Sequence, residues 1–300
     1  MSNIPRIGLA LGGGGARGLA HLSVLRVLEE NDIPIAAIAG TSIGAIIGAS
    51  YALEPKIDKV QKEIQEFLHS PKFMESGFDL FKKRTAAENF FGQVATYVKE
   101  RIVINLAHSR LSLVGAWRVS RAVDELLACR KFQDCRIPFC CVATDLQSGE
   151  EVIFREGELS KPVQASMSIP GFLPPVEHNG HLLVDGAVLS PVPVAACRAL
   201  GADVVIAVEV GQRLDQNGEL DSVIDIVFRA SSITARQYTE MLLREADVVI
   251  RPEIGDIHWS EFSKMQIALT AGERAAKKAL PEIRRYVKPR RSLWQRVFGP

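Results

Sequence analysis

An excess of charge of one sign is missing from this sequence. Lysine and arginine total 36 and aspartate and glutamate total 35, which leaves a formal net charge of +1 at pH 7. A protein held on nucleic acid by general electrostatic attraction carries a clear basic excess. The sequence therefore argues against nucleic acid as the partner. Only the stretch 284–300, which contains basic residues and no acidic ones, departs from the balance.

Cysteine is scarce and has none of the spacings that carry chemistry. The chain has five cysteines and no C-x-x-C pair, so neither a disulfide framework nor a zinc site is indicated. Cys140 and Cys141 stand in an apolar run, where neighbouring side chains of a strand point to opposite faces. We expect buried, reduced thiols. His178 and His181 lack the further ligands that a metal site needs, so we predict no metal and no cofactor.

A long apolar leader is also missing. Before the glycine run, the only apolar stretch is Ile7–Leu11, which is shorter than the hydrophobic segment of a secretory signal. We therefore expect a cytoplasmic protein. The uncharged run 33–53 has Gly40, Gly44 and Gly48 at the small-residue spacing of packed membrane helices. Polar and glycine residues interrupt this run, so a short strand followed by a small-faced helix fits better.

What the sequence does contain is an alternation of strand-like and helical segments. Its apolar content of 47% and charged content of 24% are typical of a globular protein. Strands alternating with helices predict an α/β fold, a three-layer αβα sandwich with a mainly parallel central sheet. The predicted strands are 6–11, 35–39, 138–146, 151–154, 182–184, 204–210 and 248–251, and the predicted helices are 19–30, 43–53, 159–168, 194–200, 223–246 and 264–286.

Residues 55–129 depart from this alternation. Their pattern is helical and more polar, and we expect a helical insertion after the second helix that covers one edge of the sheet. Aromatic residues cluster between Phe67 and Phe91. They form either the hydrophobic core of the insertion or the lining of a lid.

A glycine-rich loop follows the first predicted strand. Gly13, Gly15 and Gly18 satisfy G-x-G-x-x-G between a strand and a helix, which resembles a dinucleotide-binding fingerprint. The acidic residue expected at the end of the second strand is missing, and no Lys-Ser or Lys-Thr pair makes a phosphate-binding loop. What remains is a set of backbone N–H groups beside a helix N-terminus, and such groups stabilise negative charge.

The second predicted strand runs into Gly40-Thr41-Ser42-Ile43-Gly44, a G-x-S-x-G sequence. Flanking glycines permit a sharp strand-to-helix turn that exposes a serine hydroxyl above the sheet. The alternative interpretation of Ser42 alone is a cap of the helix. The glycine loop favours a nucleophile, because it supplies donors for a negatively charged intermediate.

A serine nucleophile needs a base, and the usual partner is a histidine oriented by a carboxylate. Among the six histidines, only His258 follows a plausible acid in the hydrolase order Ser, Asp, His. Asp185 ends a predicted buried strand and precedes Gly186, where its carboxylate could meet Ser42 directly. The residues alone leave open a triad completed by His258 and a Ser–Asp pair.

Four motifs in the same order resemble the patatin-like phospholipases, in particular the bacterial members similar to the neuropathy target esterase. The similarity covers about residues 7–210. Many members have Asp-Gly-Gly where this chain has Asp-Gly-Ala. The motifs are Gly-Gly-Gly-Ala-Arg-Gly at 13–18, Gly-Thr-Ser-Ile-Gly at 40–44, Ala-Ser-Met-Ser-Ile-Pro-Gly at 165–171 and Asp-Gly-Ala at 185–187.

The resemblance implies a lipid acyl hydrolase with a Ser–Asp dyad and no catalytic histidine, which cleaves carboxylic esters of phospholipids or lysophospholipids through an acyl-enzyme. Arg17 would either hold the glycine loop in shape or recognise phosphate. The implied residues are Ser42 as nucleophile, Asp185 as base, Gly13, Gly14, Gly15 and the Arg17 loop as oxyanion donors, and Gly18, Gly40, Gly44 and Gly186 as supports of the motifs.

The resemblance, together with the helical insertion and the basic tail, gives the expected domain boundaries. We expect an acyl hydrolase domain at 7–210 that contains the insertion 55–129, a C-terminal α/β extension at 211–287 packed on the same core, and a basic tail at 288–300. Two alternatives remain: an ordinary α/β-hydrolase esterase that uses His258, and a catalytically idle regulatory or membrane-docking protein of the same fold.

The tail combines basic and apolar residues. If it is helical, its apolar side chains line one face, and its basic side chains attract anionic lipid head groups. We therefore expect peripheral contact with the inner face of a membrane. A frayed terminus or a docking strip for a second copy of the chain are the alternatives. The residues concerned are Lys288, Arg290, Arg291, Leu293, Trp294, Arg296, Val297 and Phe298.

Overall fold

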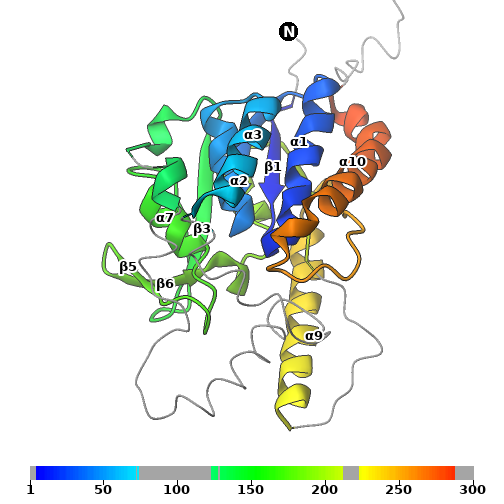
Figure 1. The fold of residues 1–300 in the computed structure, drawn as a ribbon. Helices are drawn as coiled ribbons and strands as arrows, with labels where there is room; N and C mark the ends of the chain where they lie inside the picture. The colour runs from blue at the N-terminus through cyan, green and yellow to red at the C-terminus, as the bar shows by residue number, and fades with distance from the viewer. Residues whose placement is uncertain (1–4, 72, 74–122, 128, 212–222, 288–300) are drawn as a thin grey trace, which may run out of the picture.

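Strands from both halves of the chain form one eight-stranded sheet (Figure 1). The computed structural model describes residues 5–71, 73, 123–127, 129–211 and 223–287. The strand order is β5-β6-β3-β2-β1-β7-β8, with β4 paired to β3. The strands are β1 (Ile7–Leu11), β2 (Ile35–Gly40), β3 (Phe139–Asp145), β4 (Glu151–Phe154), β5 (Val176–His178), β6 (His181–Asp185), β7 (Val204–Val208) and β8 (Val248–Ile250).

The middle of the sheet is parallel. Strands β3, β2, β1, β7 and β8 run in one direction, whereas β4, β5 and β6 join by antiparallel pairing. The predicted α/β fold with a mainly parallel sheet is therefore confirmed.

Helices cover both faces of the sheet. One face carries α1, α2, α3 and α10, with α10 packed along α1, and the other face carries α8. These helices and the short 3-10 turns are α1 (Ala20–Glu30), α2 (Ile43–Leu53), α3 (Ile57–His69), α7 (Ser160–Ser166), α8 (Val194–Ala199), α9 (Val223–Leu243), α10 (Met265–Val287), η1 (Gly15–Leu19), η3 (Phe132–Asp134), η4 (Gly186–Val188) and η5 (Phe262–Lys264).

The sheet separates two hydrophobic clusters of different size, and the alternation of residue size along β1 explains the difference. Leu9 and Leu11 point into the larger cluster beneath α1 and α2, whereas Ala10 points toward α8. Side chains alternate between the faces of a strand, and a Cβ atom at Gly8 would collide with Cys197 and Ala202 on the α8 side. Small residues on this face therefore allow the close approach of α8.

The cysteines follow the same alternation. Cys141 lies in the larger core and Cys140 in the α8 core, and all five cysteines are free thiols. Cys140, Cys141 and Cys197 are buried, whereas Cys129 is exposed. Burial raises the pKa of Cys197 to about 12, so this thiol stays protonated.

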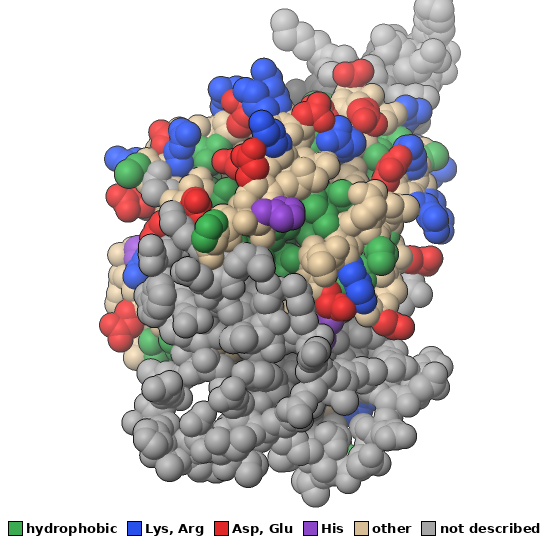
Figure 2. Space-filling model, in the orientation of Figure 1, with side chains coloured by type: hydrophobic (Ala, Val, Ile, Leu, Met, Phe, Trp, Pro, Cys, Tyr) green, Lys and Arg blue, Asp and Glu red, His purple; other side chains and the backbone are tan. Residues whose placement is uncertain are grey.

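The uncharged run 33–53 forms the predicted short strand and helix, β2 and α2. In the part of the chain that the structure describes, no helix is both long and apolar enough to cross a membrane. On the face shown in Figure 2, acidic and basic side chains are interspersed over the region that carries α1, α3 and α10.

Several predicted features lie outside the described residues. They are residues 74–122 of the expected insertion, with Phe78, Phe81, Phe90, Phe91 and His108, and the basic tail 288–300. Helix α3 is the described start of the predicted helical segment and packs against α1 and α2.

Candidate active site

Ser42 stands on a strained turn between β2 and α2. Its backbone has φ 56° and ψ −122°, outside the regions that a serine ordinarily adopts. A Cβ at Gly40 would lie 2.5 Å from the Gly44 carbonyl oxygen, and a Cβ at Gly44 would collide with the Leu11 carbonyl. Both glycines are thus required for the close approach of strand and helix. The Ser42 N–H donates to Ser166 Oγ at 2.9 Å, which anchors the turn.

Strand register brings Asp185 to the level of Ser42. Gly40 pairs with Cys141 across β2 and β3, and Asp185 pairs with Ala143 across β3 and β6. Ala143 stands two residues beyond Cys141, as Ser42 stands two residues beyond Gly40. Both side chains therefore occupy the same edge of the sheet.

Backbone contacts fix Asp185 in place. Its N–H donates to the Ser168 carbonyl at 2.8 Å, and its Oδ1 accepts from the Ala187 N–H at 2.8 Å. A Cβ at Gly186 would collide with the Val142 carbonyl. Glycine at 186 thus allows η4 to begin directly after the carboxylate.

The carboxyl group of Asp185 is buried and faces Ser42. Burial raises its pKa to about 7, while the Ala187 N–H and the Ser42 hydroxyl act in the opposite direction by favouring the ionised form. Among the described residues, Oδ2 accepts no hydrogen bond within 3.5 Å. The Ser42 hydroxyl is thus close enough to influence the carboxyl group, and Oδ2 is available to receive a proton.

The glycine loop passes against Ser42. A Cβ at Gly13 would lie 3.2 Å from Ser42 Cβ, and the Gly13 N–H donates to the Pro191 carbonyl at 3.0 Å. The N–H groups of Gly14 and Gly15 are not taken up by any acceptor in the described part of the chain. Of the three predicted oxyanion donors, Gly13 is therefore already bonded, and Gly14 and Gly15 have N–H groups available.

The C-terminal part of the chain supports this loop. Gly15 has φ +58°, and a Cβ there would collide with the Trp259 carbonyl, which accepts from the Ala16 N–H at 2.6 Å. A Cβ at Gly18 would collide with the Ile43 side chain. The loop is therefore packed between residue 259 on one side and the start of α2 on the other.

Arg17 points into the protein interior. Its side chain is buried, Nε donates to the Val210 carbonyl at 3.1 Å, and Nη1 donates to the Ile257 carbonyl at 3.1 Å. Burial lowers its pKa to about 10, and Glu209 opposes that shift. These contacts favour support of the loop over recognition of a phosphate group.

Two residues of the site were missed by sequence reasoning. Ser166 accepts the Ser42 N–H, and its only sequence signal is its place in the 165–171 motif. His21 is buried on α1, and its Nε2 lies 2.8 Å from the Gly12 carbonyl. Burial lowers the pKa of His21 to about 4, so the imidazole is neutral and donates to Gly12 through Nε2.

Among the described residues, no histidine forms a hydrogen bond with Asp185. His258 Nδ1 lies 2.7 Å from Ser260 Oγ, His181 Nδ1 lies 3.0 Å from Asp145 Oδ2, and His69 Nδ1 lies 2.7 Å from the Gln65 carbonyl. The groups that shift the pKa of Asp185 are Ala187 and Ser42. A triad through His258 gains no support from this arrangement.

Comparison with known proteins identifies the family. The model of the patatin-like phospholipase family matches residues 9–198. The chain belongs to the patatin-like phospholipase family. The matched region contains Ser42, Asp185 and the whole glycine loop.

The family includes relatives from animals and mycobacteria. A patatin-like phospholipase domain-containing protein of Caenorhabditis elegans is 37% identical over 70% of this chain and 14% of its own length. An uncharacterised NTE family protein of Mycobacterium tuberculosis is 32% identical over 70% of this chain and 50% of its own. Human patatin-like phospholipase domain-containing protein 6 is 32% identical over 69% of this chain and 13% of its own length. The chain thus spans half or less of these relatives' length.

The fold is shared with a more distant protein. VipD from Legionella pneumophila superposes with a TM-score of 0.50 at 13% identity, covering 93% of this chain and 67% of VipD. At that level of identity, the similarity concerns the fold alone.

Proposed function

We propose that this protein is a lipolytic serine acyl hydrolase in which Ser42 and Asp185 form the catalytic dyad. Membership of the patatin-like phospholipase family supports lipid hydrolase activity. The observation that carries the dyad is the buried Asp185 carboxyl group, whose pKa is raised to about 7 beside the hydroxyl of a serine on a strained turn. A base is most effective when its pKa lies near the working pH.

In the first half-reaction, Ser42 Oγ attacks the ester carbonyl carbon while its proton passes to Asp185 Oδ2. The carbonyl oxygen becomes an oxyanion, which the available N–H groups of Gly14 and Gly15 stabilise beside the start of η1. The C–O bond to the alcohol then breaks. Protonated Asp185 returns its proton to the leaving alkoxide, and the acyl group remains on Ser42.

In the second half-reaction, water replaces the alcohol. Asp185 Oδ2 takes a proton from water as its oxygen attacks the acyl carbon, and the same N–H groups stabilise the second oxyanion. When this intermediate collapses, the bond to Ser42 Oγ breaks and Asp185 returns the proton to the serine. The products are a free fatty acid and the regenerated enzyme.

We assign the substrate to carboxylic esters of phospholipids or lysophospholipids. This assignment rests on the family and on relatives named as phospholipase-domain proteins. A soluble p-nitrophenyl ester serves as a reporter of the same chemistry without a lipid surface.

The test is covalent labelling by a fluorophosphonate, with the modified residue located by mass spectrometry and turnover measured on a lysophospholipid and a p-nitrophenyl ester. We expect the label on Ser42, and we expect Ser42→Ala and Asp185→Asn each to lose at least 10²-fold in turnover. Ser50→Ala is the matched control, because Ser50 is buried on the same helix and its Oγ has no partner among the described residues. The fluorophosphonate should label this variant, and the variant should hydrolyse both esters, as in the wild type.

Two outcomes would contradict the proposed function. Residual turnover above about a tenth of wild type in both Ser42→Ala and Asp185→Asn would exclude the dyad. Absence of labelling, together with no hydrolysis across a panel of lipid esters, would favour the catalytically idle alternative.

A further inference from the structure

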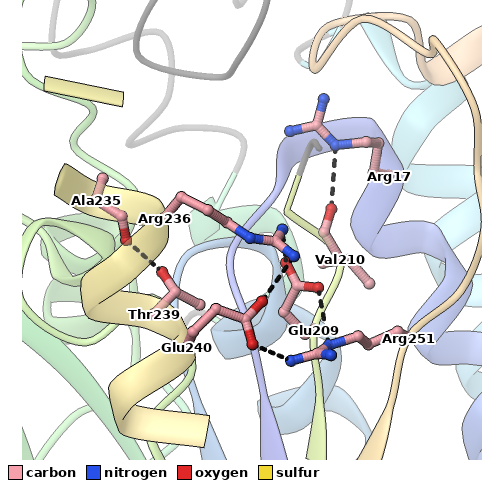
Figure 3. A network of polar contacts seen from close by, with 8 residues as sticks. All are labelled: Arg17, Glu209, Val210, Ala235, Arg236, Thr239, Glu240 and Arg251. Carbon is pink, nitrogen blue, oxygen red and sulfur yellow. Dashed lines mark hydrogen bonds and ion pairs between the residues drawn. The ribbon is translucent and has the colours of Figure 1, made fainter. Parts of the chain in front are cut away.

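Glu209, the residue after β7, carries a buried carboxyl group at the rear of the glycine loop. Its side chain is 7% exposed, and burial of an isolated charge is strongly unfavourable. Arg236 Nη1 lies 3.9 Å from Oε1, and Arg251 Nε lies 3.7 Å from Oε2 (Figure 3). Two guanidinium groups therefore compensate this carboxylate.

Glu240 completes the ionic cluster. It pairs with Arg236 at 2.7 Å and with Arg251 at 2.5 Å, so each arginine lies between two carboxylates (Figure 3). Arg236 and Glu240 belong to α9, which extends beyond the carboxyl edge of the sheet, and Arg251 follows β8 (Figure 1). The cluster thus joins α9 and β8 to the end of β7.

Glu209 also holds the backbone on both sides of Val210. Its own N–H donates to the Ile250 carbonyl at 3.0 Å. The Gly211 N–H, Arg236 and Arg251 each favour the ionised form of the Glu209 carboxyl group, which lowers its pKa. Burial has the larger effect, so the pKa is raised overall. Residues 209–211 are therefore held by the backbone bond to Ile250 and by the contact of the Gly211 N–H with the Glu209 carboxyl group.

Val210 in turn contacts the glycine loop. Its carbonyl accepts the hydrogen bond from Arg17 Nε at 3.1 Å, and a Cβ at Gly14 would lie 2.9 Å from the same oxygen. Glu209 also stabilises the charged form of Arg17, because it opposes the lowering of the arginine pKa by burial. A shift of Glu209 would therefore reach Gly14 through Val210 and Arg17.

We propose that Glu209 is a positioning residue of the active site: its carboxylate fixes Val210 and Arg17, and through them it holds the Gly14 and Gly15 N–H groups where the oxyanion forms. Its effect on turnover rests on the proposed function. Its effect on the loop does not.

The experiment compares Glu209→Gln, which keeps the shape and removes the charge, with Glu209→Asp and with a matched control. The control is Asp247→Asn, because Asp247 secures the opposite end of β7 by accepting from the Val205 N–H at 2.8 Å and pairing with Arg198 at 2.8 Å. Two experiments are performed: steady-state kinetics on a p-nitrophenyl ester, which gives kcat and KM, and amide hydrogen exchange of the peptide that covers residues 12–18.

We expect Glu209→Gln to lower kcat about tenfold with KM within twofold, less than the 10²–10³ typical of a lost oxyanion donor, and to speed exchange of the 12–18 peptide. In Glu209→Asp, kcat and the exchange rate of the 12–18 peptide should both lie closer to the wild-type values than in Glu209→Gln. Asp247→Asn should lower the melting temperature but leave kcat and the exchange of that peptide unchanged. Because Glu209 acts partly through Arg17, the loss of kcat in the double variant Arg17→Met/Glu209→Gln should be smaller than the product of the two single losses.

Unchanged exchange of residues 12–18 in Glu209→Gln would overturn the positioning role. So would a loss of kcat that multiplies with that of Arg17→Met. If the wild-type protein shows no turnover and no labelling of Ser42, the proposed function fails. The exchange measurement still decides the role of Glu209 in that case.

Discussion

Asp185 Oδ1 accepts a hydrogen bond from the Ala187 N–H, while its Oδ2 remains without a hydrogen bond among the described residues. The two oxygens of one carboxyl group therefore have different tasks. One oxygen fixes the orientation of the group, and in the proposed mechanism the other exchanges a proton with Ser42. Burial, rather than a neighbouring negative charge, is the main cause of the raised pKa of this group.

The pH dependence of catalysis should report this carboxyl group. Asp185 must be ionised to accept the Ser42 proton, so kcat/KM should rise through an apparent pKa of about 7 and fall as the pH is lowered below it. The measurement is a pH profile on a soluble ester. An activity that stays constant down to pH ~5 would contradict the assignment of Asp185 as the base.

The stability of Asp185→Asn relative to the wild type should also depend on pH. The folded pKa of Asp185 is about 7 and its unfolded reference is 3.8, so between these values the folded state holds the extra proton and wild-type stability falls as the pH rises. Asparagine does not ionise, so the stability of the variant has no such pH dependence. From pH 4 to pH 8, the difference in unfolding free energy should shift in favour of the variant by up to about 4 kcal/mol. Urea unfolding at both pH values measures it, and a constant difference would show that Asp185 is not destabilised by burial.

Two glycines on α2 should respond differently to alanine. At Gly44 the new methyl group meets the backbone carbonyl of Leu11, whereas at Gly48 it meets the side chains of Phe139 and Ile38 at 3.0 and 3.1 Å. Side chains can shift and a buried backbone cannot. Gly44→Ala should therefore destabilise the fold by more than about 2 kcal/mol, while Gly48→Ala, helped by about 1 kcal/mol of helix propensity, should stay near wild type. Equal urea midpoints for the two variants would refute this account of the turn.

His258→Ala should leave ester turnover near the wild-type level. The His258 imidazole contacts Ser260, and burial lowers its pKa to about 4, so it is neutral near pH 7 and has no described contact with Asp185. Turnover of the p-nitrophenyl ester is the measurement. A loss of about 10²-fold or more would instead support a triad.

Deletion of residues 288–300 should weaken binding to anionic vesicles. Basic side chains near such a surface contribute about 1 kcal/mol each, and Trp294 favours the lipid–water interface. Hydrolysis of vesicle-borne lipid should fall while hydrolysis of a soluble short-chain ester is spared. Equal vesicle sedimentation of the truncated and full-length proteins at low salt would argue for the frayed terminus or the docking strip.

The elements with a strong apolar pattern could be predicted from the sequence. The bounds of α2 agree with the prediction at 43–53, and the motif context of Ser42, a strand before and a helix after, is present. The His21 and Trp259 contacts could not be predicted, because each involves a backbone carbonyl that leaves no mark in the sequence. The availability of Gly14 and Gly15 rather than Gly13 depends on Pro191, far along the chain.

The Trp259 carbonyl and the Ile257 carbonyl, which hold Ala16 and Arg17, lie beyond residue 198, where the family match ends. The same is true of Val210 and its contact with Gly14. A fragment trimmed to the matched region would thus keep every signature residue and lose the scaffolding that gives the glycine loop its shape. The shape of the glycine loop therefore depends on a longer part of the chain than the region by which the family is detected.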